Sequence, residues 1–120
     1  MEVEIFTAGS YDGVIQALAA DQIEFAFLGS SSYAAAYTET NAGVVPLVSR
    51  LQKDGSTGYF SVITVRCDSG YKTLEDLKGK TLAFADPDST SGYAVPFFNL
   101  SKQGYDPKTY FGAVPFFRCP

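Results

Sequence analysis

The chain has 120 residues, of which 46% are apolar, and its 9 basic and 13 acidic residues give a net charge of −4. This composition favours a folded domain over a disordered segment, and no run of Lys or Arg is available to neutralise nucleic-acid phosphates. There is no His, and Cys67 and Cys119 lack the spacing of metal ligands, so we expect no zinc site, no His-based catalytic triad and no cofactor.

The start of the chain and its cysteines bear on localisation. Residues 1–4 lack the basic end and apolar core of a signal peptide. No apolar stretch approaches the roughly 20 residues needed to cross a bilayer. As written, the sequence therefore predicts a cytoplasmic protein in which Cys67 and Cys119 are free thiols.

The first half of the chain alternates between strand-like and helix-like segments at short spacing. Ser10 can cap a helix in which Val14, Ile15 and Leu18 group on one side. A nearly all-apolar run further on is typical of a strand buried on both faces of a parallel sheet. In order, the pattern predicts a strand at 3–7, a helix at 10–20, a strand at 23–28, a helix at 33–39 and a strand at 44–50.

The second half continues this alternation. Thr73 and Asp76 form a helix start that is similar to a capping box. Pro96 is expected to kink the early part of a longer helix, and Asp106 with Pro107 opens another helix by cap and first-turn preferences. The pattern predicts strands at 59–66, 81–85 and 113–117 and helices at 74–77, 91–102 and from 107 onward.

Together these segments predict an α/β fold with a mostly parallel sheet and helices on both faces. In such sheets, ligands bind beyond the carboxyl ends of the strands, where helix N-termini converge. Three strand-to-helix turns fit that position, and each is rich in Ser, Thr or Gly: 8–11, 29–33 and 86–92.

The third of these turns is the most informative. Ser89, Thr90 and Ser91 precede a predicted helix, where free backbone N–H groups and the helix dipole favour an anion. Hydroxyls donate without carrying charge, so they could hold an oxyanion without a buried ion pair. Simple capping of the helix explains the same three residues equally well on local grounds.

A family resemblance adds to this interpretation. The stretch Asp-Pro-Asp-Ser-Thr-Ser-Gly-Tyr at 86–93 resembles the signature of phosphonate-, phosphite- and phosphate-type solute-binding proteins of ABC importers. The segments 11–18, 23–33, 58–63 and 73–80 are similar to that family in order and spacing. The resemblance implies a type II periplasmic-binding-protein fold that is truncated at both ends and leaves two incomplete lobes.

The resemblance also implies a division of the chain and a set of ligand contacts. It implies a partial first lobe at 1–58, a crossing strand at 59–70 and a partial second lobe at 71–120. The ligand would lie between the lobes, and Ser31 and Ser32 are further candidates that helix capping also explains. The implied ligand-binding residues are Tyr11, Tyr59, Ser89, Thr90 and Ser91.

The sequence thus predicts a binding protein for a small phosphonate-like oxyanion, with an ABC permease as partner of the full-length protein. Family members are periplasmic or lipid-anchored, which differs from the cytoplasmic expectation above. Exposed strand edges and apolar faces would favour a homo-oligomer. The alternative is a truncated remnant that acts as an oligomeric structural protein without ligand binding. An enzyme is disfavoured, because no His base accompanies the serines.

Overall fold

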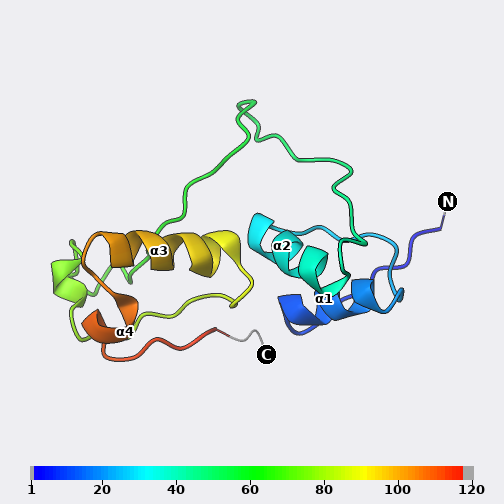
Figure 1. The fold of residues 1–120 in the computed structure, drawn as a ribbon. Coiled ribbons are helices and arrows are strands. Elements are labelled where there is room, and N and C mark those ends of the chain that lie inside the picture. The colour runs from blue at the N-terminus through cyan, green and yellow to red at the C-terminus, as the bar shows by residue number, and fades with distance from the viewer. Residues whose placement is uncertain (1, 118–120) are drawn as a thin grey trace.

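Short helices and long extended segments make up the chain. The computed structural model describes residues 2–117, and Figure 1 shows two helical groups joined by a wide arch of chain. No helix among these residues is long and apolar enough to span a membrane. The helical elements are α1 (Tyr11–Ala19), α2 (Ser30–Glu39), the 3₁₀ turn η1 (Glu75–Leu77), the π-helical turn η2 (Thr90–Ala94), α3 (Val95–Lys102) and α4 (Pro107–Tyr110).

Side-chain caps explain where several of these helices begin. Ser10 Oγ accepts from the N–H of Gly13 at 3.2 Å and starts α1. Asp76 Oδ2 accepts from the N–H of Thr73 at 3.0 Å, which is one of the two bonds of a capping box. Asp106 caps α4 from the residue before it. The predicted helix starts at Ser10 and Asp106 are confirmed, whereas residues 75–77 form only a 3₁₀ turn whose N-cap, Leu74, makes no side-chain cap bond.

The helix predicted at 91–102 is in fact two elements. In η2 the backbone bonds span five residues, since the N–H of Ala94 donates to the carbonyl of Ser89 at 3.0 Å and that of Val95 to the carbonyl of Thr90. The chain then changes to α-helical geometry in α3. A short π segment of this kind is rare and is frequently found at functional sites.

The predicted parallel α/β sheet is wrong. Among residues 2–117 the structure contains no strand, and two isolated parallel bridges, Thr81 to Ala113 and Phe84 to Phe116, are the β-pairing it shows. A strand exists when its backbone N–H and C=O groups pair with a neighbour. The segments 3–7, 23–28, 44–50 and 59–66 have the apolar pattern but show no such pairing. The segments 81–85 and 113–117 do lie side by side, since Leu82 and Phe84 donate to the carbonyls of Ala113 and Pro115, but this single short pairing makes no sheet.

Two small apolar clusters hold the helical groups together. Ile15 of α1 is 1% exposed and lies with the buried Ala36 where α1 packs against α2. In the other group, Phe84 is buried and its ring meets Tyr93 edge-on at 5.1 Å between centroids. Phe97 lies 6.2 Å from the same ring. Each cluster is small, so much of the apolar surface of the chain remains outside both.

The long connection between the helical groups, residues 42–66, is called the arm here. It arches away from the helices in Figure 1 and turns back at Gln52, whose N–H donates to the carbonyl of Ser56 at 2.9 Å. Its apolar side chains face solvent, with Val48 at 89% and Phe60 at 94% exposure. The arm therefore has strand-like composition but nothing packed along most of its length.

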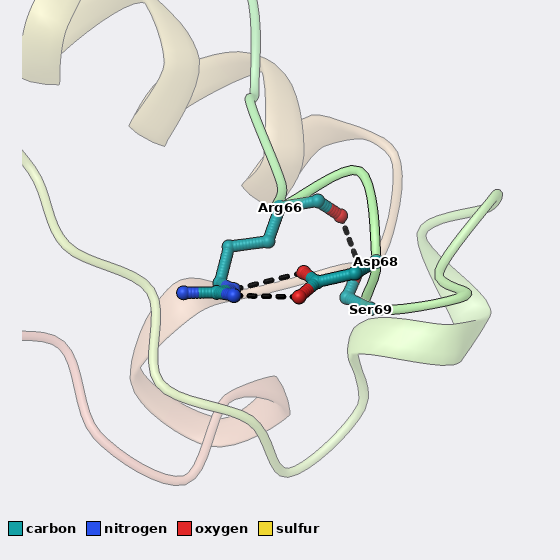
Figure 2. A network of polar contacts seen from close by, with 3 residues as sticks. All are labelled: Arg66, Asp68 and Ser69. Carbon is teal, nitrogen blue, oxygen red and sulfur yellow. Dashed lines mark hydrogen bonds and ion pairs between the residues drawn. The ribbon is translucent and has the colours of Figure 1, made fainter.

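A compact polar turn ends the arm (Figure 2). The guanidinium of Arg66 donates to both carboxylate oxygens of Asp68, at 2.9 and 2.6 Å, and Ser69 Oγ donates to the Arg66 carbonyl at 2.7 Å. The pair is exposed, so it contributes little to stability. Cys67 lies in this turn with an exposed free thiol, whereas Cys119 lies outside the described residues.

The overall dimensions reflect this open arrangement. The accessible surface is 9435 Å², roughly half as much again as the about 6,300 Å² of a compact monomer of this mass. The radius of gyration is 17.1 Å, against about 14 Å for a compact domain of 120 residues. The chain thus carries apolar surface that a compact monomer would bury.

Candidate ligand-binding site

The turn at 86–92 is built by its own side chains. Asp86 Oδ1 accepts from the N–H of Asp88 at 2.8 Å, and Ser89 Oγ accepts from the N–H of Gly92 at 3.0 Å. A Cβ at Gly92 would lie 2.6 Å from that of Ala85, so this position has room for glycine alone. The turn holds Ser89 nearly buried, at 6% exposure, as the N-cap of η2.

The N-terminus of α2 packs directly on this turn. The N–H of Ser31 donates to Thr90 Oγ1 at 2.7 Å, and Ser32 Oγ donates to the carbonyl of Asp88 at 2.7 Å. Gly29 lets the two segments approach, since a Cβ there would lie 3.1 Å from Thr90 Oγ1. Residues about 60 positions apart in the chain are therefore joined by two short hydrogen bonds.

The N-terminus of α1 reaches the same turn. The N–H of Tyr11 donates to Asp86 Oδ2 at 3.3 Å, across 75 residues of sequence. Three helix N-termini, those of α1, α2 and η2, thus meet at one place. Each of them leaves backbone N–H groups without intrahelical partners and carries a partial positive charge.

The arm contributes two hydroxyls to the turn. Tyr59 OH donates to Ser91 Oγ at 2.8 Å, and Ser61 Oγ donates to the carbonyl of Ser91 at 2.6 Å. The two residues are two positions apart on an extended segment, where alternate side chains lie on the same side. The arm is thereby tied to the turn at Ser91, although the rest of it is exposed.

The direction of these hydrogen bonds matters for the chemistry. Ser89 accepts from Gly92, Thr90 accepts from Ser31, and Ser91 accepts from Tyr59. A hydroxyl has one proton to donate and two lone pairs that accept. Ser89 and Thr90 accept from backbone N–H groups, so each uses a lone pair inside the protein and keeps its own proton for another acceptor. Ser91 shares one hydrogen bond with the Tyr59 hydroxyl, in which either group can be the donor.

Acidic side chains border the turn. Burial raises the pKa of Asp88, and the negative charges of Asp86 and Asp12 raise that pKa further. An anion at this turn would thus be held by hydroxyl and amide donors against the repulsion of nearby carboxylates. A hollow of about 340 Å³ lies on the Asp86 side, with a lining that includes Ser10 and Phe116 rather than the hydroxyls of the turn.

Comparison with known proteins settles the family. The family model described as ABC transporter, phosphonate, periplasmic substrate-binding protein matches residues 1–118. The chain belongs to this family. The phosphonates-binding periplasmic protein of Escherichia coli (strain K12) is 38% identical over 100 residues, covering 80% of this chain and 29% of that protein.

A second relative has a similar level of identity. The phosphate-import protein PhnD of Mycolicibacterium smegmatis is 33% identical over 105 residues, covering 86% of this chain and 32% of that protein. The chain thus spans about a third of the length of the curated relatives it matches. The predicted family resemblance is confirmed, and the family is one of periplasmic binding proteins rather than enzymes.

The structure gathers the predicted site residues of this phosphonate-binding family member at one turn. Their role in binding a ligand stays a prediction, as does the division into lobes at 1–58 and 71–120. The sequence did not predict that Asp86 and Ser61 connect the turn to α1 and to the arm, because each forms its hydrogen bond across a long sequence separation. The residues within the turn or bonded to it are Tyr11, Ser31, Ser32, Tyr59, Ser89, Thr90 and Ser91.

Proposed function

We propose that the chain is the oxyanion-binding part of a phosphonate-type solute-binding protein of an ABC importer. The anion would be held by the hydroxyl protons of Ser89, Thr90 and Ser91 at the N-terminus of η2. The observation that carries this proposal is the hydrogen bonding of the turn. Ser89 and Thr90 accept from backbone N–H groups and so retain their own protons, and Ser91 shares its hydrogen bond with the Tyr59 hydroxyl.

The chemistry of the donors fits a tetrahedral oxyanion. A phosphonate or phosphate offers three or more oxygen acceptors, and the turn offers three hydroxyl protons close together. Hydroxyls bind without a counter-charge, so the ligand can leave again without breaking a buried ion pair, as transport requires. The names of the relatives, one a phosphonates-binding protein and one a phosphate-import protein, support the same ligand class.

The two tyrosines would complete the site. Tyr59 donates to Ser91 and is two-thirds exposed, so its hydroxyl can turn toward a ligand at a small cost in packing. Tyr11 stands at the start of α1 with a half-exposed ring. Both side chains combine an apolar body with a polar tip, which suits the closing of a polar site against water.

The partners follow from the family and belong to the whole protein. A substrate-binding protein of this family delivers its ligand to an ABC permease, and the family description places it in the periplasm. We propose the same role and location for the full-length protein that contains this segment.

Calorimetric titration tests the proposal. The chain is titrated with phosphate, phosphite, methylphosphonate and 2-aminoethylphosphonate, and then the variant Ser89→Ala/Ser91→Ala is titrated in the same way. Ser49→Ala is the matched control, because Ser49 is an exposed serine of the arm. We expect saturable binding of at least one of these anions that the control retains and the double variant weakens by about a hundredfold, at roughly tenfold for each lost hydrogen bond to a charged group. Equal binding by the double variant, or no binding by the parent chain at millimolar anion, would overturn the proposal.

A second candidate is a structural, oligomeric role without ligand binding. The observation that favours it is the accessible surface of 9435 Å², which leaves room to bury the about 800 Å² per partner of a stable interface. Homo-oligomers would then cover the exposed apolar side chains of the arm. Light scattering on a size-exclusion column tests this role, and a monodisperse monomer at high concentration would rule it out.

A further inference from the structure

Ser61 stands out because it binds the turn without belonging to it. Its neighbour Phe60 is 94% exposed, whereas Tyr59 and Ser61 both reach Ser91. This alternation is that of an extended chain, in which every second side chain lies on one side. The arm therefore presents a pair of hydroxyls to one residue of the turn.

The carbonyl of Ser91 receives no backbone hydrogen bond in the π-helical register of η2. In η2 the N–H groups of Ala94 and Val95 donate five residues back, to the carbonyls of Ser89 and Thr90. The next nitrogen in that register belongs to Pro96, which carries no hydrogen. The Ser91 carbonyl thus lacks the donor that the register would assign to it, and the hydroxyl of Ser61 bonds to it at 2.6 Å.

We propose that Ser61 is a positioning residue for Tyr59. Its hydroxyl binds the Ser91 carbonyl, which receives no helical hydrogen bond because residue 96 is Pro. This bond fixes the arm so that the Tyr59 hydroxyl lies beside the ligand site. The proposal rests on the proposed function and names a residue that acts through Tyr59 rather than on the anion itself. Both hydroxyls of the arm meet Ser91, but they do so differently. Tyr59 meets the hydroxyl of Ser91, which an incoming anion would engage, whereas Ser61 meets the carbonyl, which an anion would not.

This difference gives the two hydroxyls separate tasks. When the Ser91 hydroxyl donates a hydrogen bond to an anion, the Tyr59 hydroxyl can rotate and donate to the anion as well. The bond from Ser61 to the carbonyl persists through that exchange, so the arm stays in register. Without Ser61 the phenol would have to be held in place by the rest of an exposed arm, at an entropic cost to binding.

The test uses the full chain with inorganic phosphate as the probe in calorimetry. We expect Ser61→Ala to weaken binding about five- to tenfold, the value of one hydrogen bond, and Ser61→Thr, which keeps the hydroxyl, to bind like the parent. Tyr59→Phe should weaken binding, and the double variant Ser61→Ala/Tyr59→Phe should bind as Tyr59→Phe does. Losses that multiply in the double variant would overturn the proposal, because Ser61 would then act independently of Tyr59.

The variant Pro96→Ala tests the origin of the open carbonyl. It gives residue 96 an N–H that can donate to Ser91, so adding Ser61→Ala should then cost less than about twofold in affinity. An undiminished loss in that background would show that Pro96 has no part in recruiting the arm.

An NMR measurement on the anion-free chain tests the positioning role of Ser61 independently of ligand binding. In the anion-free chain, the ring resonances of Tyr59 in an NMR spectrum should move in Ser61→Ala and return in Ser61→Thr. If the parent chain fails to bind phosphate, the ligand-binding function fails while this result still decides the positioning role. Unchanged Tyr59 resonances in Ser61→Ala would overturn it.

Discussion

The turn at 86–92 and the arm at 42–66 differ sharply in how they are bonded and packed. Both contain hydroxyl side chains, but the turn is otherwise made of Asp, Pro and Gly, whereas the arm is rich in Val and other apolar residues. In the turn, Ser89 is nearly buried and Thr90 is bonded to α2. In the arm, Val48 and Phe60 are almost wholly exposed. The polar turn is thus the bonded, packed element, and the more apolar arm is the open one.

The difference lies in where each region finds its hydrogen-bond partners. The turn satisfies itself locally, through Asp86 with Asp88 and Ser89 with Gly92, and then offers acceptors to α1 and α2. The arm would have to pair its backbone with another extended segment. Away from its ends it hydrogen-bonds to the rest of the chain through Tyr59 and Ser61 at Ser91, and its Arg50 lies over the ring of Phe27. Local capping needs a few nearby residues, whereas β-pairing needs a neighbour that the same segment cannot supply.

The largest expected effect contrasts one phenylalanine from each region. Phe84 precedes the turn and is 4% exposed, against Tyr93 at 5.1 Å between ring centroids, whereas Phe60 of the arm is 94% exposed. Phe84→Ala should lower the free energy of unfolding by about 3–5 kcal/mol. Phe60→Ala should change it by about 0.5 kcal/mol or less.

Urea denaturation followed by circular dichroism measures both changes. A comparable loss from Phe60→Ala would mean that the arm is packed in solution, which would remove the contrast between the two regions. A small loss from Phe84→Ala would mean that the aromatic cluster around the turn does not hold it.

The next effect contrasts two glycines. A Cβ at Gly92 would lie 2.6 Å from Ala85 Cβ and 2.8 Å from Ser89 Oγ, whereas one at Gly58 of the arm would meet nothing within 4 Å. Gly92→Ala should therefore lower the free energy of unfolding by about 1–3 kcal/mol and displace the Ser89 hydroxyl. Gly58→Ala is the matched control and should be nearly neutral. Thermal unfolding of the two variants checks this contrast, and equal melting temperatures would contradict it.

The sequence predicted the locally capped helices of the fold but not the absence of long-range β-pairing. The capped helices were predictable, because Ser10, Asp76 and Asp106 act on residues two or three positions away. The parallel sheet was predicted from apolar runs such as 23–28 and is not formed. An apolar run records that a segment is suited to burial, but it does not record whether a neighbour lies beside it.

The sequence indicated the candidate ligand-binding residues, but not the residues that connect the turn to α1 and to the arm. Ser89, Thr90 and Ser91 stood out as consecutive hydroxyls before a helix, and the family resemblance added Tyr11 and Tyr59. The roles of two other residues could not be predicted locally. The bond from Asp86 to α1 spans 75 residues, and the bond from Ser61 to the Ser91 carbonyl spans 30.

The smallest expected effect contrasts two carboxyls whose pKa values shift in opposite directions. Burial raises the pKa of Asp88 above its ordinary value of 3.8, and Asp86 and Asp12 raise it further. The backbone N–H of Ser56 lowers the pKa of Asp54 in the arm below the same value. The folded chain therefore binds a proton at Asp88 more readily than the unfolded chain does, and at Asp54 less readily.

Opposite dependences of stability on pH follow from these shifts. Ionised Asp88 disfavours the folded state, so stability rises as pH falls through its raised pKa, above 3.8. Asp54 contributes stability above 3.8 that is lost as pH falls through its lowered pKa. Asp88→Asn should thus stabilise the chain at neutral pH, by about 0.5 kcal/mol or less because the group is only partly buried. Carboxyl ¹³C titration checks the order, and an Asp88 that titrates below Asp54 would show that the turn leaves its acidic residues as solvated as the arm does.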